Sequence, residues 1–233
     1  MGSTRLPGKA LAEIEGRTML ARVVERVRRI AGLSEVVVAT TLDERDEPII
    51  QECDCIGVSV FRGSENDVLD RHWQVCQAYQ ADGVVRISSD CPLIDPGVST
   101  RVLEVFLREC ADFAANDLKP SYPVGLGTEI MTATALARAW REAKQPYERQ
   151  HVAPYIYRHP EYFRLINVAA PSDYSHLRWT VDTPQDLEFV RAVYARLNGS
   201  GMFDWQAVLD LLPREPALLE LNRNIRQKAI EEC

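Results

Sequence analysis

Residues 2–9 read Gly-Ser-Thr-Arg-Leu-Pro-Gly-Lys and bring together glycines, hydroxyls and two cations, Arg5 and Lys9. Glycines let backbone N–H groups approach an anion, hydroxyls donate to it, and cations neutralise phosphate charge. The segment is not a Walker A loop, which has four residues between its glycines and Ser or Thr after the lysine. Here five residues separate Gly2 from Gly8, and Ala10 follows Lys9. The segment is therefore either a phosphate-binding loop of another kind or a basic N-terminus without fixed structure.

Two aspartates directly follow predicted strands. Asp90 comes after the apolar run 83–88, and Asp182 comes after 178–181. Ligands of open α/β sheets bind beyond the carboxyl ends of strands, and Mg²⁺ is commonly held by one or two carboxylates together with substrate phosphates. Asp90 and Asp182 are therefore candidate ligands of one Mg²⁺. The alternative for both is a turn or a helix cap, which is the role we expect for Asp95.

Further polar side chains stand where a ligand could reach them. Arg71 lies one turn into a helix for which Asp67 is the expected cap, and His151 ends the run Glu-Arg-Gln-His. Glu129 lies in a glycine-rich stretch, and Arg178 begins a predicted strand. Each also has a structural interpretation, as a solvated, packed or interior side chain.

The elements that position these residues alternate along the chain. Apolar residues at helical spacing predict helices over 18–30, 46–55, 67–81 and 96–110. Short β-branched runs at 35–40, 58–61 and 83–88 predict strands, and the first of them, which lacks polar alternation, fits a strand buried on both faces. This order is typical of right-handed crossovers on a mostly parallel sheet. Beyond residue 111 we expect strand and loop over 122–132, helices over 134–144, 149–157 and from Pro184, strands over 164–168 and 178–181, and a peripheral tail after Pro213.

Composition limits the class of protein. The chain has 233 residues, 46% of them hydrophobic, and a net charge of −7, which suits one α/β domain and argues against general binding of nucleic acid or anionic membranes. The six cysteines are scattered without zinc-ligand spacing, which indicates a reducing compartment. With neither a membrane-spanning run nor an export leader in the sequence, we expect a cytoplasmic protein.

Five segments occur in an order that is similar to one known family. They are Ser-Thr-Arg-Leu-Pro-Gly-Lys, Asp-Val-Leu-Asp-Arg, Asp-Cys-Pro-Leu-Ile-Asp, Glu-Arg-Gln-His-Val-Ala-Pro-Tyr-Ile-Tyr and Trp-Thr-Val-Asp-Thr-Pro-Gln-Asp-Leu-Glu. Together, over about residues 1–197, the chain resembles the cytidylyltransferases that include CMP-sugar-acid synthetases. The branch it resembles most is that of spore coat polysaccharide biosynthesis protein F.

The resemblance implies a fold, a reaction and a site. The implied fold is a Rossmann-like, mostly parallel sheet flanked by helices, as in nucleotide-diphospho-sugar transferases. The implied reaction couples CTP to a sugar acid with Mg²⁺ and releases pyrophosphate, for surface polysaccharide synthesis. We expect one domain over 1–212, with a nucleotide-binding half (1–111), a sugar-binding half (112–212) and a tail (213–233), and a homodimer is plausible by the same resemblance.

By position, the resemblance also assigns residues. The triphosphate loop matches Gly2, Ser3, Arg5 and Lys9, and Asp90 and Asp182 match the Mg²⁺ ligands. Arg5, Lys9 and Asp90 would thus be the catalytic set. The nucleotide side would include Arg71 and Ser88, and the sugar side Glu129, His151 and Arg178.

The sequence departs from the family in one respect and leaves two other functions open. Family members have Gln-Ala-Arg at the end of a first strand, before the segment that matches Met1, and this sequence has neither; we expect the true start to lie upstream, the alternative being that a central strand and a phosphate ligand are absent. A glycosyltransferase that consumes a nucleotide sugar could use the same sheet, but its Asp-x-Asp metal pair is missing because Cys91 and Pro92 follow Asp90. A non-catalytic nucleotide-binding protein is the third reading.

Overall fold

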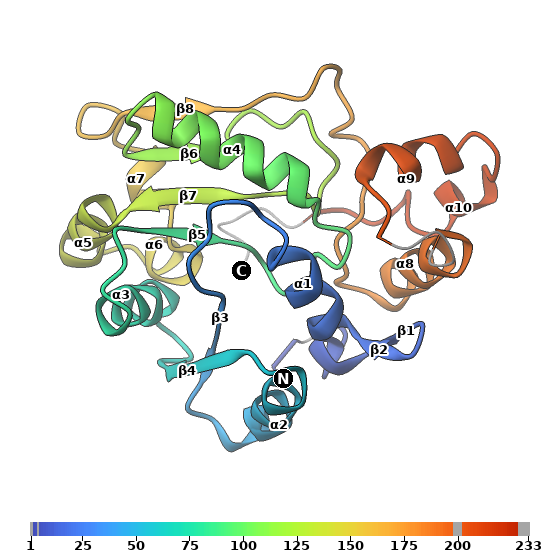
Figure 1. Cartoon of the computed structure of the whole chain (residues 1–233), viewed down its shortest axis with the longest axis horizontal. Helices are drawn as coiled ribbons and strands as arrows, with labels where there is room; N and C mark the ends of the chain where they lie inside the picture. Colours follow the sequence, from blue (N-terminus) through green and yellow to red (C-terminus); the bar gives the residue numbers. More distant parts are fainter. Residues whose placement is uncertain (1, 4, 198–201, 228–233) are drawn as a thin grey trace.

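The computed structural model describes residues 2–3, 5–197 and 202–227 (Figure 1). The amino-terminal half contains the helical turns η1 (Lys9–Leu11) and η2 (Glu44–Asp46) and the elements β1 (Glu13–Ile14), β2 (Arg17–Thr18), α1 (Met19–Val27), β3 (Val37–Thr41), α2 (Glu47–Ile56), β4 (Ser59–Gly63), α3 (Val68–Ala78), β5 (Gly83–Arg86) and α4 (Pro96–Arg108). The rest contains β6 (Phe113–Ala115), β7 (Glu129–Thr132), α5 (Ala133–Glu142), α6 (Pro146–His151), α7 (Pro154–Tyr157), β8 (Leu165–Asn167), α8 (Pro184–Leu197), α9 (Trp205–Leu211) and α10 (Ala217–Glu220). The predicted α/β class is confirmed.

The strands form two separate sheets besides the small β1–β2 hairpin. β3 and β4 pair in parallel, and a second sheet has the order β5-β7-β6-β8. β7 runs antiparallel to both β5 and β6, whereas β6 and β8 are parallel. The chain reaches β7 from β6 through residues 116–128, which form no helix in the structure, so no helical crossover restores the strand direction there.

A break in the sheet separates β3 from β5. Among the described residues, β3 pairs only with β4 and β5 pairs only with β7, so that each has one unpaired edge. Val37 and Val38 of β3 and Val84 and Val85 of β5 are only half-buried, although strands at the centre of an α/β sheet are normally covered on both faces. Figure 1 shows the two sheets as separate groups of ribbons.

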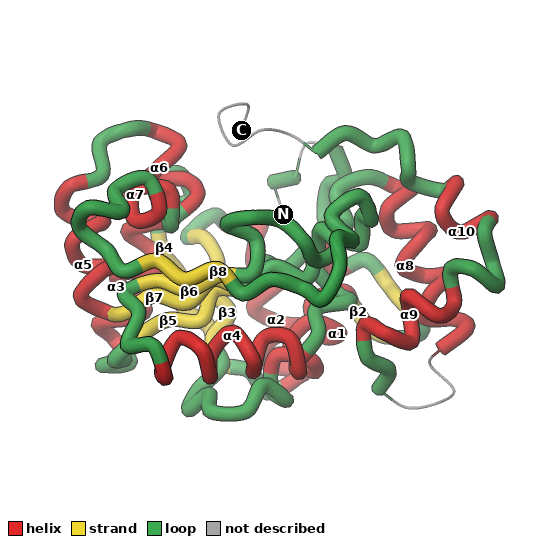
Figure 2. The backbone as a smooth tube through the Cα atoms, turned by 90° about the horizontal axis from the view of Figure 1, so that it is seen from above, coloured by secondary structure: helices red, strands yellow, loops and turns green. Residues whose placement is uncertain are grey.

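Helices cover both faces of the four-stranded sheet. Strand residues alternate between the faces: Ala114 and Ile130 pack with α4 in one buried cluster, while Phe113 and Met131 pack with α5 and α7 in another. Figure 2 shows α4 on one side of the strands and α6 and α7 on the other. This arrangement leaves the carboxyl ends of β5 and β6 free to carry polar residues.

A third cluster joins the carboxyl-terminal helices to the segment 177–181. Trp179 and Val181 are buried there against α8, and Trp205 of α9 belongs to the same cluster. The prediction of a strand over 178–181 is wrong: apart from an isolated bridge between Val124 and Arg178, this segment joins no sheet. Its apolar side chains pack in this cluster. Its backbone amides donate to single loop residues rather than to a neighbouring strand: Trp179 to the Val124 carbonyl and Val181 to the Asp90 carbonyl.

Other expectations need smaller corrections. The predicted helix over 149–157 is two short helices, α6 and α7, because the chain turns sharply at Val152, whose φ is 72°. In the segment predicted as a peripheral tail, Leu218 and Asn222 are buried. No helix among the described residues is long and apolar enough to cross a membrane.

Candidate active site

Lys9 lies at the centre of a cluster of oxygen atoms. Gly8 adopts a left-handed conformation (φ 71°), and the helical turn η1 that follows begins with Lys9. The Lys9 Nζ donates to Asp90 Oδ2, to Asp182 Oδ1 and to the Val181 carbonyl oxygen, each at 2.8 Å. Residues from the two ends of the chain and from its middle therefore meet at one ammonium group.

The backbone fixes the two aspartates relative to each other. The Asp90 carbonyl accepts a hydrogen bond from the Val181 amide at 2.8 Å and another from the Thr180 hydroxyl at 3.2 Å. The turn after β5 is thereby attached to the segment that carries Asp182. The two carboxylates therefore lie next to each other on the Lys9 ammonium.

Cations surround Asp182. Its Oδ2 atom lies 3.0 Å from Arg5 Nη2 and 2.8 Å from Arg178 Nη2. Burial raises the pKa of Asp182, but Lys9, Arg178 and Arg5 outweigh burial and the net shift is downward. Burial likewise lowers the pKa of Lys9, yet Asp90 and Asp182 outweigh it and the net shift is upward. Asp182 is therefore a charged carboxylate and Lys9 a charged ammonium at neutral pH.

The oxygen atoms of this cluster suit a hard divalent cation. Two carboxylates and one backbone carbonyl are ligand types that Mg²⁺ accepts, with water or phosphate oxygens completing the octahedron. Within the described residues there is no group of three or more His, Cys, Asp and Glu side chains that could hold a metal. Asp90 and Asp182 would thus hold Mg²⁺ together with a phosphate ligand.

The remaining candidates of the loop and of the expected nucleotide side are Gly2, Ser3, Ser88 and Arg71. The Ser3 hydroxyl accepts from the Leu6 amide at 3.3 Å, and Gly2 and Ser88 are exposed. Arg71 donates to the Ser64 carbonyl, and its stem packs so closely on Gly63 that a Cβ there would lie 2.8 Å from the Arg71 Cγ. Burial lowers the pKa of Arg71, and its Nε has no hydrogen-bond partner among the residues that the structure describes.

Glu129 takes part in a charged group that sequence reasoning missed. Arg86 and Glu129 face each other in the register of β5 and β7, with Arg86 Nη1 2.5 Å from Glu129 Oε2. Asp117, just past β6, is exposed as a whole residue, but its carboxylate packs against Gly127, and this local burial together with Glu129 raises its pKa to about 7. The sequence did contain one sign of this group: Arg86 is a charged residue in the otherwise apolar strand β5.

Arg178 and His151 have different surroundings. The Arg178 side chain is buried and binds Asp186 through Nε and Nη2. Because Nη2 also binds Asp182, Arg178 links the two carboxylates. Asp186, in the first turn of α8, also accepts from the Asp182 amide at 3.0 Å. Arg178 and Asp186 together therefore orient Asp182. His151 is half-buried at the end of α6, a helix that packs against α3.

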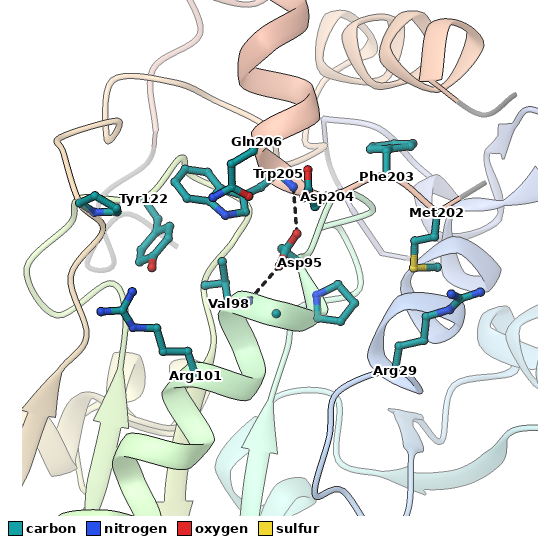
Figure 3. Close-up of a pocket in the computed structure, with 13 residues that line it drawn as sticks. Arg29, Asp95, Val98, Arg101, Tyr122, Met202, Phe203, Asp204, Trp205 and Gln206 are labelled. Carbon is teal, nitrogen blue, oxygen red and sulfur yellow. Dashed lines mark hydrogen bonds between the residues drawn. The ribbon is translucent and has the colours of Figure 1, made fainter. Parts of the chain in front are cut away.

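Asp95 has the capping role expected for it. Its Oδ1 accepts from the Val98 amide at the start of α4, and its Oδ2 accepts from the Trp205 amide at the start of α9 (Figure 3). It borders a cavity of about 390 Å³ between these helices, which is also lined by Arg101 and Tyr122. None of Lys9, Asp90 and Asp182 lines this cavity.

The sequence as a whole matches one family. The model of the family described as "Cytidylyltransferase" matches residues 1–207. The chain belongs to the cytidylyltransferase family. Members of this family are CTP-dependent nucleotidyltransferases.

Individual relatives agree with this assignment over nearly the whole chain. The chain is 31% identical to the spore coat polysaccharide biosynthesis protein SpsF of Bacillus subtilis, over 93% of this chain and 92% of the relative. It is 28% identical to the 3-deoxy-manno-octulosonate cytidylyltransferase of Bradyrhizobium diazoefficiens, over 98% and 95% of the two chains.

Solved structures support the fold. A cytidylyltransferase from Leptospira borgpetersenii superposes with a TM-score of 0.89 at 29% identity, covering 98% of this chain and 95% of that one. A CMP:2-keto-3-deoxy-manno-octonic acid synthetase complexed with CTP superposes with a TM-score of 0.61 at 24% identity, covering 84% and 95%.

Proposed function

We propose that this cytidylyltransferase couples CTP to a sugar acid in a Mg²⁺-dependent reaction, for surface polysaccharide or glycoconjugate synthesis. The observation that carries the proposal is the meeting of Lys9 and Arg5 with Asp90 and Asp182 at the loop beyond β5. Cations for a triphosphate and carboxylates for a metal are adjacent there. The names of two relatives, one acting on a sugar acid and one in coat polysaccharide synthesis, add support.

The reaction replaces one bond at the α-phosphorus of CTP by another. A hydroxyl oxygen of the sugar acid forms a bond to the α-phosphorus, the bond to the bridging oxygen breaks, pyrophosphate leaves, and the hydroxyl proton passes to solvent. Arg5 and Lys9 hold the charge that grows on pyrophosphate. Mg²⁺ held by Asp90 and Asp182 would polarise the α-phosphate and orient the leaving group. Most of the rate gain comes from positioning and charge neutralisation.

The other candidates extend the site to both sides. Gly2 and Ser3 belong to the triphosphate loop in this proposal, with Arg71 and Ser88 toward the nucleotide. Glu129 and His151 lie toward the sugar, whereas the buried pairing of Arg178 with Asp186 favours a positioning role behind Asp182. A homodimer is part of the proposal, and light scattering of the purified protein tests it.

The test measures pyrophosphate release with CTP, Mg²⁺ and 3-deoxy-manno-octulosonate or another sugar acid as acceptor. Asp90→Asn should lower turnover about a hundredfold or more, by analogy with the loss of one electrostatic contact to the transition state. Asp54→Asn, at an exposed position of α2, is the control and should retain full turnover. Full turnover of Asp90→Asn would contradict the assignment of Asp90.

A glycosyltransferase on the same fold gives a different product. It would consume a nucleotide sugar without releasing pyrophosphate, so the same assay separates the two reactions. Binding of CTP without any turnover would instead favour the non-catalytic reading.

A further inference from the structure

The ammonium group of Lys9 occupies the point on which the site's oxygen atoms converge. An ammonium has three N–H donors, and here all three have acceptors: Asp90 Oδ2, Asp182 Oδ1 and the Val181 carbonyl, each at 2.8 Å. The side chains involved are largely buried, with exposed fractions of 16% for Lys9, 22% for Asp90 and 16% for Asp182. The Lys9 ammonium thus binds the same oxygen atoms that a metal ion at this position would bind.

Lys9 and a metal ion cannot share this position. Mg²⁺ binds oxygen at about 2.0–2.1 Å and demands near-ideal octahedral geometry. An ammonium between the same two carboxylates fills the space, adds a repelling charge and already neutralises part of their charge. Lys9 must therefore leave before Asp90 and Asp182 bind a metal together.

A triphosphate supplies the place to which Lys9 moves. The lysine side chain is a point charge on a flexible four-carbon stem, and such a group changes partners by rotation of its own bonds. Arg5, in the same loop, already binds the outer oxygen of Asp182 at 3.0 Å, so an anion that attracts the loop cations draws both away from the carboxylates. Removing these cations increases the negative charge that a metal meets.

We propose that Lys9 is a placeholder cation, which fills the metal position between Asp90 and Asp182 in the nucleotide-free enzyme and leaves it for the triphosphate, so that metal binding depends on nucleotide. This inference rests on the proposed function, because it assumes that these carboxylates bind the metal. Coupling between two ligands is reciprocal, so the metal also strengthens nucleotide binding. In this way Lys9 prevents free metal ions from binding Asp90 and Asp182 until the nucleotide is bound.

The first experiment titrates nucleotide-free protein with Mn²⁺ and follows free Mn²⁺ by electron paramagnetic resonance. Lys9→Met keeps the apolar stem but removes the ammonium, and we expect it to bind Mn²⁺ about tenfold more tightly than the wild type, within the usual range of coupling between sites. Lys119→Met, at an exposed position, should bind like the wild type. Adding Asp90→Asn to Lys9→Met should abolish the gain, which locates the ion at Asp90.

A second measurement separates this proposal from the proposed function. Water-proton relaxation with Mn²⁺ and CTP detects the ternary complex of the wild type. Absence of that complex would refute the metal-dependent function itself. A ternary complex together with equal Mn²⁺ affinity of nucleotide-free wild type and Lys9→Met would overturn the placeholder role alone.

A third measurement needs no variant. The chain has only four lysines, Lys9, Lys119, Lys144 and Lys228, so lysine-selective ¹³C labelling gives few NMR signals. The Lys9 signal should move when CTP is added without metal, and should keep its position when Mg²⁺ is added alone at the same concentration. Movement with Mg²⁺ alone, equal to that with CTP, would show that Lys9 leaves independently of nucleotide and would overturn the proposal.

Discussion

Replacing Asp186 by Asn tests how the fold holds the segment that carries Asp182. Asp186 is fully buried, and its two oxygens accept from Arg178 Nε and Nη2, the Asp182 amide, the Thr183 amide and hydroxyl, and the Asn222 side chain. Donors therefore surround both oxygens. Because Asn is nearly isosteric, Asp186→Asn leaves no cavity and changes only charge and hydrogen bonding.

The magnitude follows from that environment. Whichever way the Asn amide points, its NH₂ group faces donors, so at least one oxygen loses its bonds to Arg178 and to a neighbouring group. Hydrogen bonds to charged groups contribute about 1.5–3 kcal/mol each, and breaking a buried ion pair from one side costs about 3–5 kcal/mol. Arg178 keeps its contact with Asp182 at 2.8 Å, so we expect a loss near the lower value, about 3 kcal/mol.

The same pair gives stability a pH dependence. Burial raises the pKa of Asp186, but Arg178 and the surrounding amides outweigh it and the net shift is downward. A carboxylate with a lowered folded-state pKa stabilises the protein above its unfolded pKa of about 3.9, and this contribution disappears as the pH falls through the folded-state value. Asp186→Asn should remove this part of the acid dependence.

The assay is urea unfolding at several pH values, with the slope m compared between proteins. Asp54→Asn, an exposed carboxylate on α2, is the control and should stay within about 0.5 kcal/mol of the wild type. If Asp186→Asn at pH 7 loses no more stability than this control, the buried pair does not hold the segment and the reasoning fails.

Three further perturbations address packing, backbone and charge. Leu136→Ala in α5 removes a fully buried side chain and should cost about 2–5 kcal/mol in urea unfolding. Gly125→Ala should destabilise the protein by more than about 1 kcal/mol, because Gly125 has a φ of 112° and a Cβ there would lie 2.6 Å from the backbone at 179–180; a melting temperature equal to that of the wild type would contradict this. Asp117 has a pKa raised to about 7, so its ionisation lowers stability as the pH rises from about 4 to 7, and Asp117→Asn should flatten unfolding curves over this range. An unchanged pH profile would mean that burial and Glu129 do not raise the pKa of Asp117 in the folded protein.

Much of the fold was predictable because its signals are local. The apolar spacing of Leu20, Val23 and Val24 gave the helix observed as α1, and the β-branched run before Thr40 gave β3. The loop cations Arg5 and Lys9 and the carboxylates Asp90 and Asp182 were also visible in the sequence, as residue types suited to phosphate and metal ligands. That one ammonium would bridge Asp90 and Asp182 depends on contacts between distant segments, which no local pattern records.

The failures share the same cause. The run 178–181 is apolar because Trp179 and Val181 pack against helices, and burial alone does not distinguish such a segment from a strand. Arg86 meets Glu129 because β7 pairs between β5 and β6 in the antiparallel direction. This pairing depends on tertiary structure and not on the local sequence. Neither residue's neighbours in sequence indicate that pairing.

The break between β3 and β5 has a consequence for association. Two open strand edges offer rows of amide and carbonyl groups beside half-buried valines, and such edges template the addition of any extended polypeptide. Natural sheets protect an edge with charges, proline or a bulge, whereas Val37 and Val38 of β3 and Val84 and Val85 of β5 are apolar. An extended strand that paired with either edge would satisfy its unpaired backbone groups and suppress edge-to-edge aggregation.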